Sequence, residues 1–403
     1  MFAYSQPFLT MYNPTTILHK FLEVIPRFEF EKIVIEHNAD KYAKSFTTWN
    51  LFVTLLTAQA KGWNSLREVS TGFKSHAQQL YHLGFTHAPN KSTLARVNSN
   101  RDCEIFEQFF YQLQAHLRPK LLKKKFDFEL NQVLKVIDST TVELSLSLFD
   151  WAKFRYNKGA LKVHTSFNLT DQIPEVLNIT DGKVGDINGI NFNSYHDCIL
   201  VFDRGYNSFD WFDVFDRNHV SFVCRAKRNY SFNYLGQHLK PTGTGVLKDE
   251  LVTLKNPTSN ETYSRKLRLV TYADPKTGEV YRYLSNNFSY PAEVIAYIYK
   301  KRWEIELFFK WIKQNLKIKT FLGTNENAVK TQIWVAMIYY MLLRYIQGQT
   351  NFSSMLELTR VVRELLLDNR TIFDIFSAEI RSKAKRNDED VGQLSLQGLL
   401  AKF

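Results

Sequence analysis

Two hydrophobic runs that each end in an aspartate most constrain the fold of this 403-residue chain. Residues 198–202 are all apolar and are followed by Asp203, and the run QVLKVID ends in Asp138. A short, uninterrupted apolar run is typical of a strand buried on both faces of a sheet, as in α/β proteins. Functional side chains gather at the carboxyl ends of strands in open α/β sheets, so both aspartates are candidate functional residues. The alternative is that each aspartate only caps the turn or helix after its strand.

Hydrophobic patterning divides the chain into five predicted parts. Residues 1–126 are predicted to form a helical N-terminal domain. Residues 127–229 and 289–350 are predicted to form two parts of one α/β core, and the second part carries a charged helix. Residues 230–288 contain Thr-, Tyr- and Val-rich runs, and a D-P-K-T-G turn between two of them indicates a β-rich insertion. Residues 351–403 are predicted to form a helical C-terminal region, whose last polar stretch is expected to be poorly ordered.

Composition excludes several classes of protein. With 44% hydrophobic and 15% aromatic residues, most of the chain cannot be intrinsically disordered. The apolar stretch of residues 335–343 is shorter than the ~20 residues needed to cross a bilayer, and no signal-peptide pattern is evident, so we expect no membrane partner. Three cysteines lie far apart without a C-x-x-C motif, which favours a reducing cytoplasm over a disulfide framework or a thiolate zinc site.

The balance of charge is basic, with 52 Lys and Arg residues against 40 Asp and Glu residues and a formal net charge of +12. Such an excess favours a polyanionic partner, but many basic proteins bind none, so charge alone leaves nucleic-acid binding open. One basic run, residues 118–125, follows the helical N-terminal part. It is either a solvated linker or a tether that contacts phosphates.

Two predicted helices in the N-terminal part have the outline of a helix-turn-helix. Ser65 begins an S-x-x-E capping box, and Asn90 precedes the polar, basic segment KSTLARVNSNR. The break between the two helices is longer than the usual turn of ~3–4 residues. Lys91 and Arg96 on the second helix are candidate DNA contacts, and the alternative is a solvated surface helix in a helical bundle.

Residues 299–313, YKKRWEIELFFKWIK, carry polar groups along one side of a predicted helix. At about 100° per residue, a narrow sector about four turns long contains Tyr299, Arg302, Glu306 and Lys313. A neighbouring apolar stripe is expected to pack on the sheet, which would bring Glu306 near the two strand-end aspartates. The members of that stripe are Val294, Ile298, Ile305, Phe309, Ile312 and Leu316.

Three carboxylates in one place point to a hard divalent cation. Adjacent carboxylates repel one another, and oxygen ligands of this kind suit Mg²⁺ or Mn²⁺. A neighbouring Tyr, Arg and Lys suit the oxygens of phosphate. The alternative is that Arg302 and Glu306 form an ordinary surface ion pair at i,i+4 spacing, which would contribute only ~0.3–0.5 kcal/mol.

The spacing Y-(2)-R-(3)-E-(6)-K of these four helix residues is similar to the signature of one large group of bacterial insertion-sequence transposases, the fourth insertion-sequence family. V-I-D-S-T around Asp138, K-V-H on the next strand and F-D-R-G-Y around Asp203 support the resemblance. It covers residues 130 to 350 or thereabouts. The helical N-terminal part, including K-S-T-L-A-R, also resembles an extra domain that some members carry.

The resemblance implies an RNase H-like catalytic core that is interrupted by a β-rich insertion. Carried over residue by residue, the DDE triad is Asp138, Asp203 and Glu306, which would bind two Mg²⁺ or Mn²⁺ ions. The implied activity is that of a transposase that binds terminal inverted repeats and moves its element by cut-and-paste, through metal-dependent DNA cleavage and strand transfer. The implied partners are double-stranded DNA and, in the synaptic complex, a second copy of the chain. The implied location is the bacterial cytoplasm, in association with the nucleoid.

DNA contacts are expected around this triad. By resemblance, Tyr299, Arg302 and Lys313 are expected to grip phosphates near the transposon end. His164 is a further candidate, but an ordinary core histidine is an equal alternative. The candidates near the scissile phosphate and along the DNA backbone are Lys162, His164, Arg204, Tyr206, Arg225 and Lys227. For Arg225 and Lys227, the alternative is a solvated strand end.

Two tyrosines at the close of the predicted insertion are candidates to stack on a flipped base. Related enzymes flip a base at the transposon end, and flipping needs an aromatic or apolar platform. Tyr281 and Tyr283 stand where the family would typically have a tryptophan. The alternative is cross-strand aromatic packing in a hairpin.

Two other functions stay open from the sequence. An RNase H-like structure-specific nuclease would cut branched DNA without terminal repeats, although the long insertion and the four-residue signature argue against it. An inactive, transposase-derived DNA-binding protein would bind DNA without metal and without cleavage, although it would gain nothing from three converging acids. A glycosidase with paired carboxylates is disfavoured by the basic surroundings, which suit phosphate.

Overall fold

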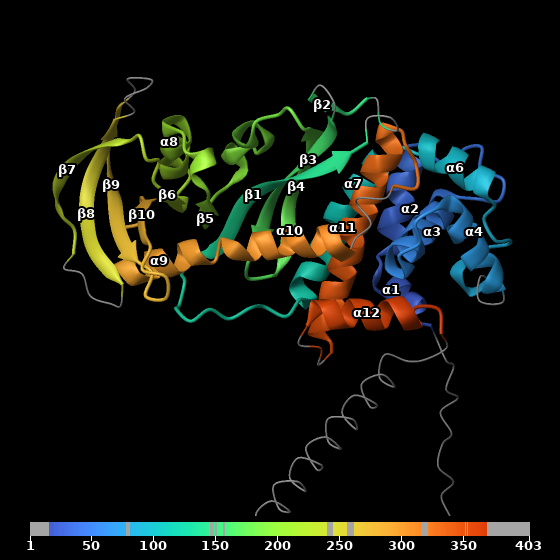
Figure 1. Cartoon of the computed structure of the whole chain (residues 1–403). Helices are drawn as coiled ribbons and strands as arrows, with labels where there is room; N and C mark the ends of the chain where they lie inside the picture. The colour runs from blue at the N-terminus through green and yellow to red at the C-terminus, as the bar shows by residue number, and fades with distance from the viewer. Residues whose placement is uncertain are drawn as a thin grey trace, which may run out of the picture.

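The computed structural model shows a mixed α/β protein in which helical segments from both ends of the chain pack beside one large sheet (Figure 1). In the part of the chain described below, no helix is long and apolar enough to span a membrane. Leu316 of the predicted apolar stripe and the polar C-terminal stretch lie outside the described residues. The structure describes residues 16–77, 81–145, 149, 151–155, 158–239, 245–255, 262–315, 321–350, 352 and 354–368.

The N-terminal part is helical, as predicted. Ser65 caps α4 and Asn90 caps α6, each by accepting a hydrogen bond from the backbone N–H three residues later, at 3.1 and 2.8 Å. Every residue of α3 from Thr48 to Ala60 is buried, so α3 forms the centre of the helical part. The helices there are α1 (Ile17–Val24), α2 (Arg27–Glu36), α3 (Thr48–Lys61), α4 (Leu66–Ser75), α6 (Lys91–Asn100) and α7 (Glu104–Leu117).

The sheet has the strand order β2-β3-β1-β5-β6-β10-β9-β8-β7, and β4 pairs with β3 beside this path. β1, β5 and β6 run parallel at its centre, whereas β10 pairs antiparallel with β6. The β-rich segment therefore extends the central sheet, and its D-P-K-T-G segment turns between β9 and β10 as predicted. The strands are β1 (Val133–Leu144), β2 (Lys153–Arg155), β3 (Lys158–Asn168), β4 (Ile173–Asp181), β5 (Cys198–Phe202), β6 (Ser221–Arg225), β7 (Ser231–Gln237), β8 (Val246–Lys255), β9 (Thr262–Ala273) and β10 (Val280–Ser285).

β5 is buried along its whole length, as its apolar run predicts. Its alternate residues enter two different cores: Ile199 and Val201 belong to one, and Leu200 and Phe202 to the other. The first core includes residues of α9 (Ala292–Lys300) and α10 (Trp303–Asn315), and the second includes residues of α8 (Phe209–Arg217). Helices therefore cover both faces of the central strands, which is the arrangement that a continuous apolar strand requires (Figure 1).

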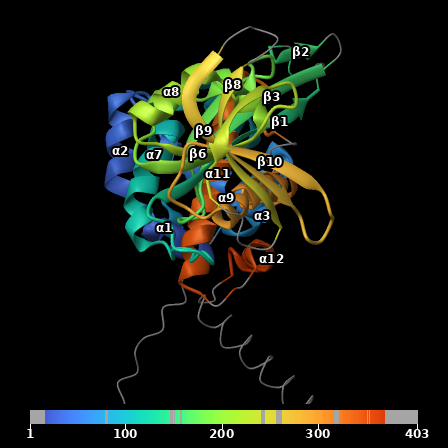
Figure 2. The same cartoon turned by 90° about the vertical axis from the view of Figure 1, so that its left-hand side faces the viewer.

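α11 (Glu326–Gly348) joins the two ends of the chain into one hydrophobic core. Every residue from Thr331 to Leu343 is buried, and the helix packs against α3, α6 and α7 of the N-terminal part (Figures 1 and 2). The ring of Trp334 lies 5.3 Å from that of Phe110. α12 (Met355–Leu365) then packs against α11 and α3. The N-terminal helices thus share their core with helices that begin after residue 325.

Candidate active site

The two aspartates lie side by side at one edge of the central strands. β1 and β5 pair in parallel with Ile137 beside Phe202, so the next residues, Asp138 and Asp203, leave this pair at the same level. β5 ends at this point as predicted, and Asp203 begins a short 3₁₀ turn. The sequence predicts that β1 also ends at Asp138, but β1 continues to Leu144 because its later residues keep pairing with β3.

The charged segment predicted as one helix forms two helices. α9 ends at Lys300 and α10 begins at Trp303. Between them, the backbone N–H of Arg302 donates to the carbonyl of Tyr299 at 3.0 Å, an i,i+3 bond that makes a tighter turn than an α-helix. α10 nevertheless packs against β1 through the predicted apolar side. The described and buried members of that side on α10 are Ile305, Phe309 and Ile312.

Arg302 joins two of the candidate acids. Its Nη1 lies 3.3 Å from Oδ2 of Asp138, and its Nη2 donates to Oε1 of Glu306. The Arg302 side chain is 19% exposed and reaches from the α9–α10 turn to β1, so it does more than form a surface pair within one helix. Asp203 lies close enough for its charge to act on Asp138. The structure therefore brings together Asp138, Asp203, Arg302 and Glu306.

Burial makes a charged Asp138 unfavourable. The pKa of Asp138 is raised to about 6, chiefly by burial and further by the negative charges of Glu306 and Asp203. The backbone N–H of Ser139 and the guanidinium of Arg302 oppose this shift. The part of this shift that comes from Glu306 and Asp203 reflects repulsion between carboxylates, which added positive charge would relieve.

Neutralising Asp138 is expected to stabilise the metal-free protein above pH 6. An aspartate in an unfolded chain ionises near pH 3.9, whereas folded Asp138 ionises near pH 6, so its contribution to stability falls as the pH rises through this window. Asp138→Asn should match wild type near pH 4 and be more stable by about 1–3 kcal/mol at pH 8, because each pKa unit corresponds to ~1.4 kcal/mol. Chemical unfolding in the presence of a chelator measures the difference.

The exposed Asp210 of α8 provides the matched control. Asp210→Asn should show no comparable gain in stability between pH 4 and pH 8. If Asp138→Asn were less stable than wild type at pH 8, the attraction to Arg302 would outweigh the cost of burial, and the prediction would be wrong.

An open cleft of about 490 Å³ lies over Asp138 and Glu306. Asp138 from β1 and Glu306 and Lys313 from α10 line the same concave surface. Lys310 and Gln314 also line it, and sequence reasoning missed both, although their spacing of four and eight residues after Glu306 places them on that helix face. The full lining is Asp138, Ser139, Thr140, Glu306, Phe309, Lys310, Lys313 and Gln314.

A second polar pair lies beside the cleft. Lys162 on β3 forms an ion pair with Asp186 at 3.0 Å, and Asp186 also accepts a hydrogen bond from Oγ of Ser139. Because Ser139 follows Asp138 on β1, this pair stiffens the strand next to the candidate acid. Sequence reasoning missed Asp186, which lies in a segment without a helical or strand-like hydrophobic period.

Two predicted DNA contacts are buried. His164 is fully buried, and its Nε2 lies 2.9 Å from Oγ1 of Thr180. Gly189 lies directly over the imidazole, where a Cβ atom would come within 2.2 Å of ring atoms. Tyr206 is 3% exposed and belongs to the aromatic core beneath β5 that includes Phe202. Neither side chain is accessible to DNA in this structure, which corrects that expectation and agrees with the core alternative for His164.

Tyr299 lies in a stack of aromatic rings at the end of α9. Its ring centroid is 4.6 Å from that of Tyr283, which in turn lies 6.1 Å from that of Tyr281. The guanidinium of Arg225 lies 4.9 Å over the ring of Tyr281. Tyr283 is 4% exposed, so cross-strand packing describes it better than a role as a base-stacking platform. Tyr281 is half-buried.

The remaining predicted contacts lie at the surface or near it. Arg204 is exposed directly after Asp203, and half-buried Lys227 donates to the carbonyl of Asn207 at 2.9 Å. Lys91 and Arg96 are exposed on α6, in the helical part of the molecule (Figure 1). The structure does not bring these two residues to the cleft.

One group of potential metal ligands lies elsewhere. In the part of the chain that the structure describes, ligand atoms of His37, Asp102 and Glu104 lie within 4.8 Å of one another on the surface of the helical part. The acids of the cleft are held further apart, and Arg302 stands between Asp138 and Glu306.

Comparisons with known proteins find transposases or parts of them. The family described as Transposase DDE domain matches residues 131–342, and the Domain of unknown function (DUF4372) matches residues 13–86. A putative transposase of Sinorhizobium fredii is 33% identical over 293 residues, or 71% of this chain and 80% of that protein. A probable insertion sequence transposase of Geobacillus stearothermophilus is 33% identical over 224 residues, or 54% of this chain and 57% of that protein. A putative insertion sequence transposase of Synechocystis is 28% identical over 259 residues, or 63% of this chain and 70% of that protein.

Proposed function

The chain belongs to the DDE transposase family, and from that premise we propose that it cleaves DNA at the terminal inverted repeats of an insertion sequence and joins the cut ends to target DNA. As a family member it is an enzyme of phosphoryl transfer on DNA. One observation carries the proposal: Asp138 and Glu306, from two separate elements, line one cleft, and Asp203, from a third, lies close enough for its charge to act on Asp138. Movement of the element by cut-and-paste is part of the same proposal.

The three acids fit hard divalent cations. They offer only carboxylate oxygens, the donors that Mg²⁺ and Mn²⁺ prefer. Repulsion of Asp138 by Glu306 and Asp203, the smaller cause of its raised pKa, also supports a site that gains from added positive charge. We assign Asp138, Asp203 and Glu306 as the residues that would hold two such ions. Bound there, the ions would supply Lewis acidity toward the scissile phosphate and lower the pKa of the attacking hydroxyl.

The basic groups of the cleft would hold and orient the DNA backbone. Lys313 lines the cleft with Glu306, and the planar guanidinium of Arg302 matches phosphate oxygens two at a time. Tyr299 supports Arg302, whose guanidinium lies 6.0 Å from the centre of its ring. Because little covalent chemistry falls to the protein in phosphoryl transfer, these residues would act by positioning and by neutralising charge.

The parts of the chain would divide the work of transposition. The exposed basic residues Lys91 and Arg96 on α6 support a role of the N-terminal helices in binding the transposon end. Synapsis of two ends requires two copies of the chain, so we propose a homodimer there, in the bacterial cytoplasm and associated with the nucleoid. The proposed parts are an end-binding domain (1–126), an RNase H-like core (127–229 and 289–350), its β-rich insertion (230–288) and a C-terminal region (351–403).

Cleavage and strand transfer in vitro test this function. With Mg²⁺ and DNA that carries the inverted repeats flanking its gene, the wild-type protein should cut at the repeat ends and join them to a target plasmid. A chelator should abolish both products, and Mn²⁺ should restore them, because the three acids then regain a divalent partner. The proposal fails if neither ion supports cleavage of these ends. Equal cutting of branched DNA without repeats would favour a structure-specific nuclease instead.

A further inference from the structure

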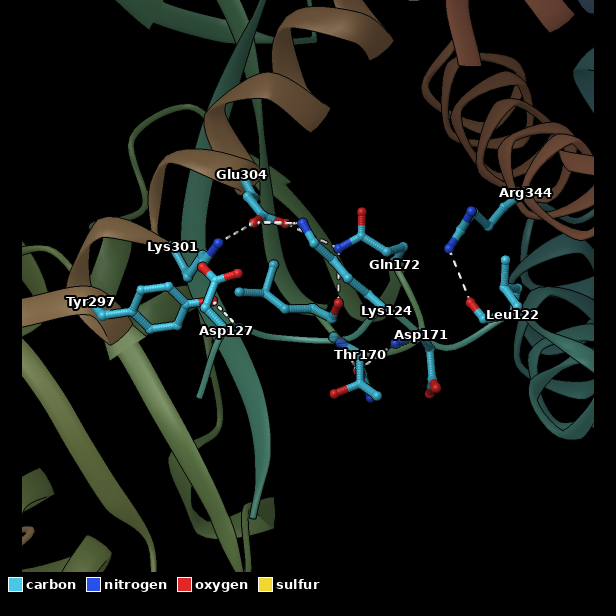
Figure 3. Close-up of polar contacts among 12 residues, drawn as sticks. Leu122, Lys124, Asp127, Thr170, Asp171, Gln172, Tyr297, Lys301, Glu304 and Arg344 are labelled. Atoms are coloured by element: carbon cyan, nitrogen blue, oxygen red, sulfur yellow. Dashed lines mark hydrogen bonds and ion pairs between the residues drawn. The ribbon is translucent and has the colours of Figure 1, made fainter. Parts of the chain in front are cut away.

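A lysine of the linker between the N-terminal helices and β1 holds the start of α10. Nζ of Lys124 donates to both carboxylate oxygens of Glu304, at 2.7 Å each (Figure 3). Nε2 of Gln172 donates to the same carboxylate at 3.1 Å, and Nζ of Lys301 lies 3.9 Å from it. Glu304 is only 18% exposed, so water screens these charge-assisted contacts less than it would at the surface.

The groups that hold Glu304 are themselves anchored. The backbone N–H of Lys124 donates to the carbonyl of Thr170 in the β3–β4 turn, at 2.8 Å. Gln172 in the same turn has a φ of 59°, a left-handed conformation that few non-glycine residues adopt. Its carbonyl accepts a hydrogen bond from the Tyr340 hydroxyl of α11 at 3.1 Å. Arg344 of α11 donates to the carbonyl of Leu122 at 3.1 Å (Figure 3). The linker, the turn and α11 therefore form one fixed frame.

This frame acts on the part of α10 that faces the cleft. Glu304 lies two residues after Arg302 and two residues before Glu306, in the first turn of the helix. The turn that contains it is held by i,i+3 hydrogen bonds, including Glu304 N–H to the carbonyl of Lys301 at 3.0 Å and Ile305 N–H to the carbonyl of Arg302 at 3.2 Å. A shift of Glu304 would thus move the two neighbouring charged groups relative to Asp138. Displacing a catalytic group by ~1 Å can lower a rate ~100-fold.

We propose that Lys124 is a positioning residue for DNA cleavage: it holds Glu304 and so fixes the start of α10, with Glu306 and Arg302 facing Asp138. This inference rests on the proposed function. It gives Lys124 a role that differs from both possibilities left open for the basic run, a solvated linker and a phosphate-contacting tether, because Lys124 then acts through its contact with Glu304.

Substitution of Lys124 separates these two roles. Lys124→Met should lower the cleavage rate at saturating DNA about 10–100-fold, the usual cost of losing a partner that orients a ligand, and leave the dissociation constant for the DNA unchanged. Lys124→Arg should keep most of the rate, because it can still donate two hydrogen bonds to Glu304. Glu304→Gln should also slow cleavage, and the double variant Lys124→Met/Glu304→Gln should be no slower than the worse single variant.

Lys330→Met is the matched control, because the ion pair that it removes, with Glu326 at 2.6 Å, joins two residues of α11. It should leave cleavage unchanged. Hydrogen exchange of residues 301–313 in the DNA-free protein gives a second readout, and it should accelerate in Lys124→Met and not in the control.

Two results would overturn the proposal. If Lys124→Met weakens DNA binding in a salt-dependent way and keeps the wild-type rate at saturation, Lys124 is a phosphate contact. Unchanged hydrogen exchange of residues 301–313 in Lys124→Met would equally contradict it. If the wild-type protein cleaves no cognate DNA, the proposed function fails, and the exchange experiment still decides whether Lys124 fixes α10.

Discussion

Replacing Glu306 by glutamine is expected to lower DNA cleavage by at least about 10³-fold, the scale of loss when one member of a catalytic unit is removed. The substitution keeps the size of the side chain and its contact with Arg302, but it removes a negative charge from the three-acid group. DNA binding should persist or become slightly tighter, because a negative charge near phosphates is lost. Cleavage of end-labelled repeat DNA with Mg²⁺, together with a DNA-binding titration, measures both quantities.

Glu357→Gln on α12 is the control for this prediction, since Glu357 is exposed. It should cleave like wild type. If the Glu306→Gln protein cleaves at the wild-type rate, Glu306 is not a catalytic residue, and the prediction is wrong. If the Glu306→Gln protein loses DNA binding together with cleavage, the fold of α10 depends on the negative charge of Glu306.

The largest expected loss of stability comes from a buried ion pair in the β-rich segment. Arg268 on β9 and Asp249 on β8 are 0% and 1% exposed, and they form two parallel bonds of 2.8 and 2.7 Å. Asp249→Asn should destabilise the protein by about 3–5 kcal/mol, because it leaves a guanidinium buried without its counter-charge. Chemical unfolding followed by circular dichroism measures the change.

An exposed pair of the same length provides the contrast. Arg27 and Glu31 on α2 lie 2.8 Å apart and are both more than half exposed, so Glu31→Gln should cost less than ~0.5 kcal/mol. Replacing both members of the buried pair, as in Arg268→Met/Asp249→Leu, should recover part of the loss, because no unpaired charge stays behind. A loss below ~1 kcal/mol in Asp249→Asn would show that water or a shifted side chain compensates Arg268.

Local patterns account for what could be predicted from the sequence. The apolar run of β5 identifies a strand buried on both faces, and the positions of Ser65 and Asn90 identify two helix starts. Both features depend on neighbouring residues alone, so period and capping chemistry suffice. The convergence of Asp138 and Asp203 also follows, because parallel strands that pair in register carry their next residues to the same edge.

Contacts between distant segments could not be predicted in the same way. Lys124 meets Glu304 across 180 positions, and the basic run around it has no pattern that distinguishes a bound lysine from an exposed one. The burial of His164 depends on Gly189, which lies in a segment without a period. The break between α9 and α10 could not be predicted, because YKKRWEIELFFKWIK contains neither glycine nor proline to mark it.

The position of α11 has a consequence for how the protein is made. α7 ends at Leu117, but α11, which packs against it, begins only at Glu326. At ~5–20 residues per second, the ribosome releases the first helices on the order of tens of seconds before their partner. During that delay the face of α7 that carries Phe110 has no Trp334 to cover it. A chain that stops within the β-rich segment would therefore lack the helix that completes the core of the N-terminal part. If that part binds transposon ends, as we propose, such an unfinished product should not compete with the complete protein for them.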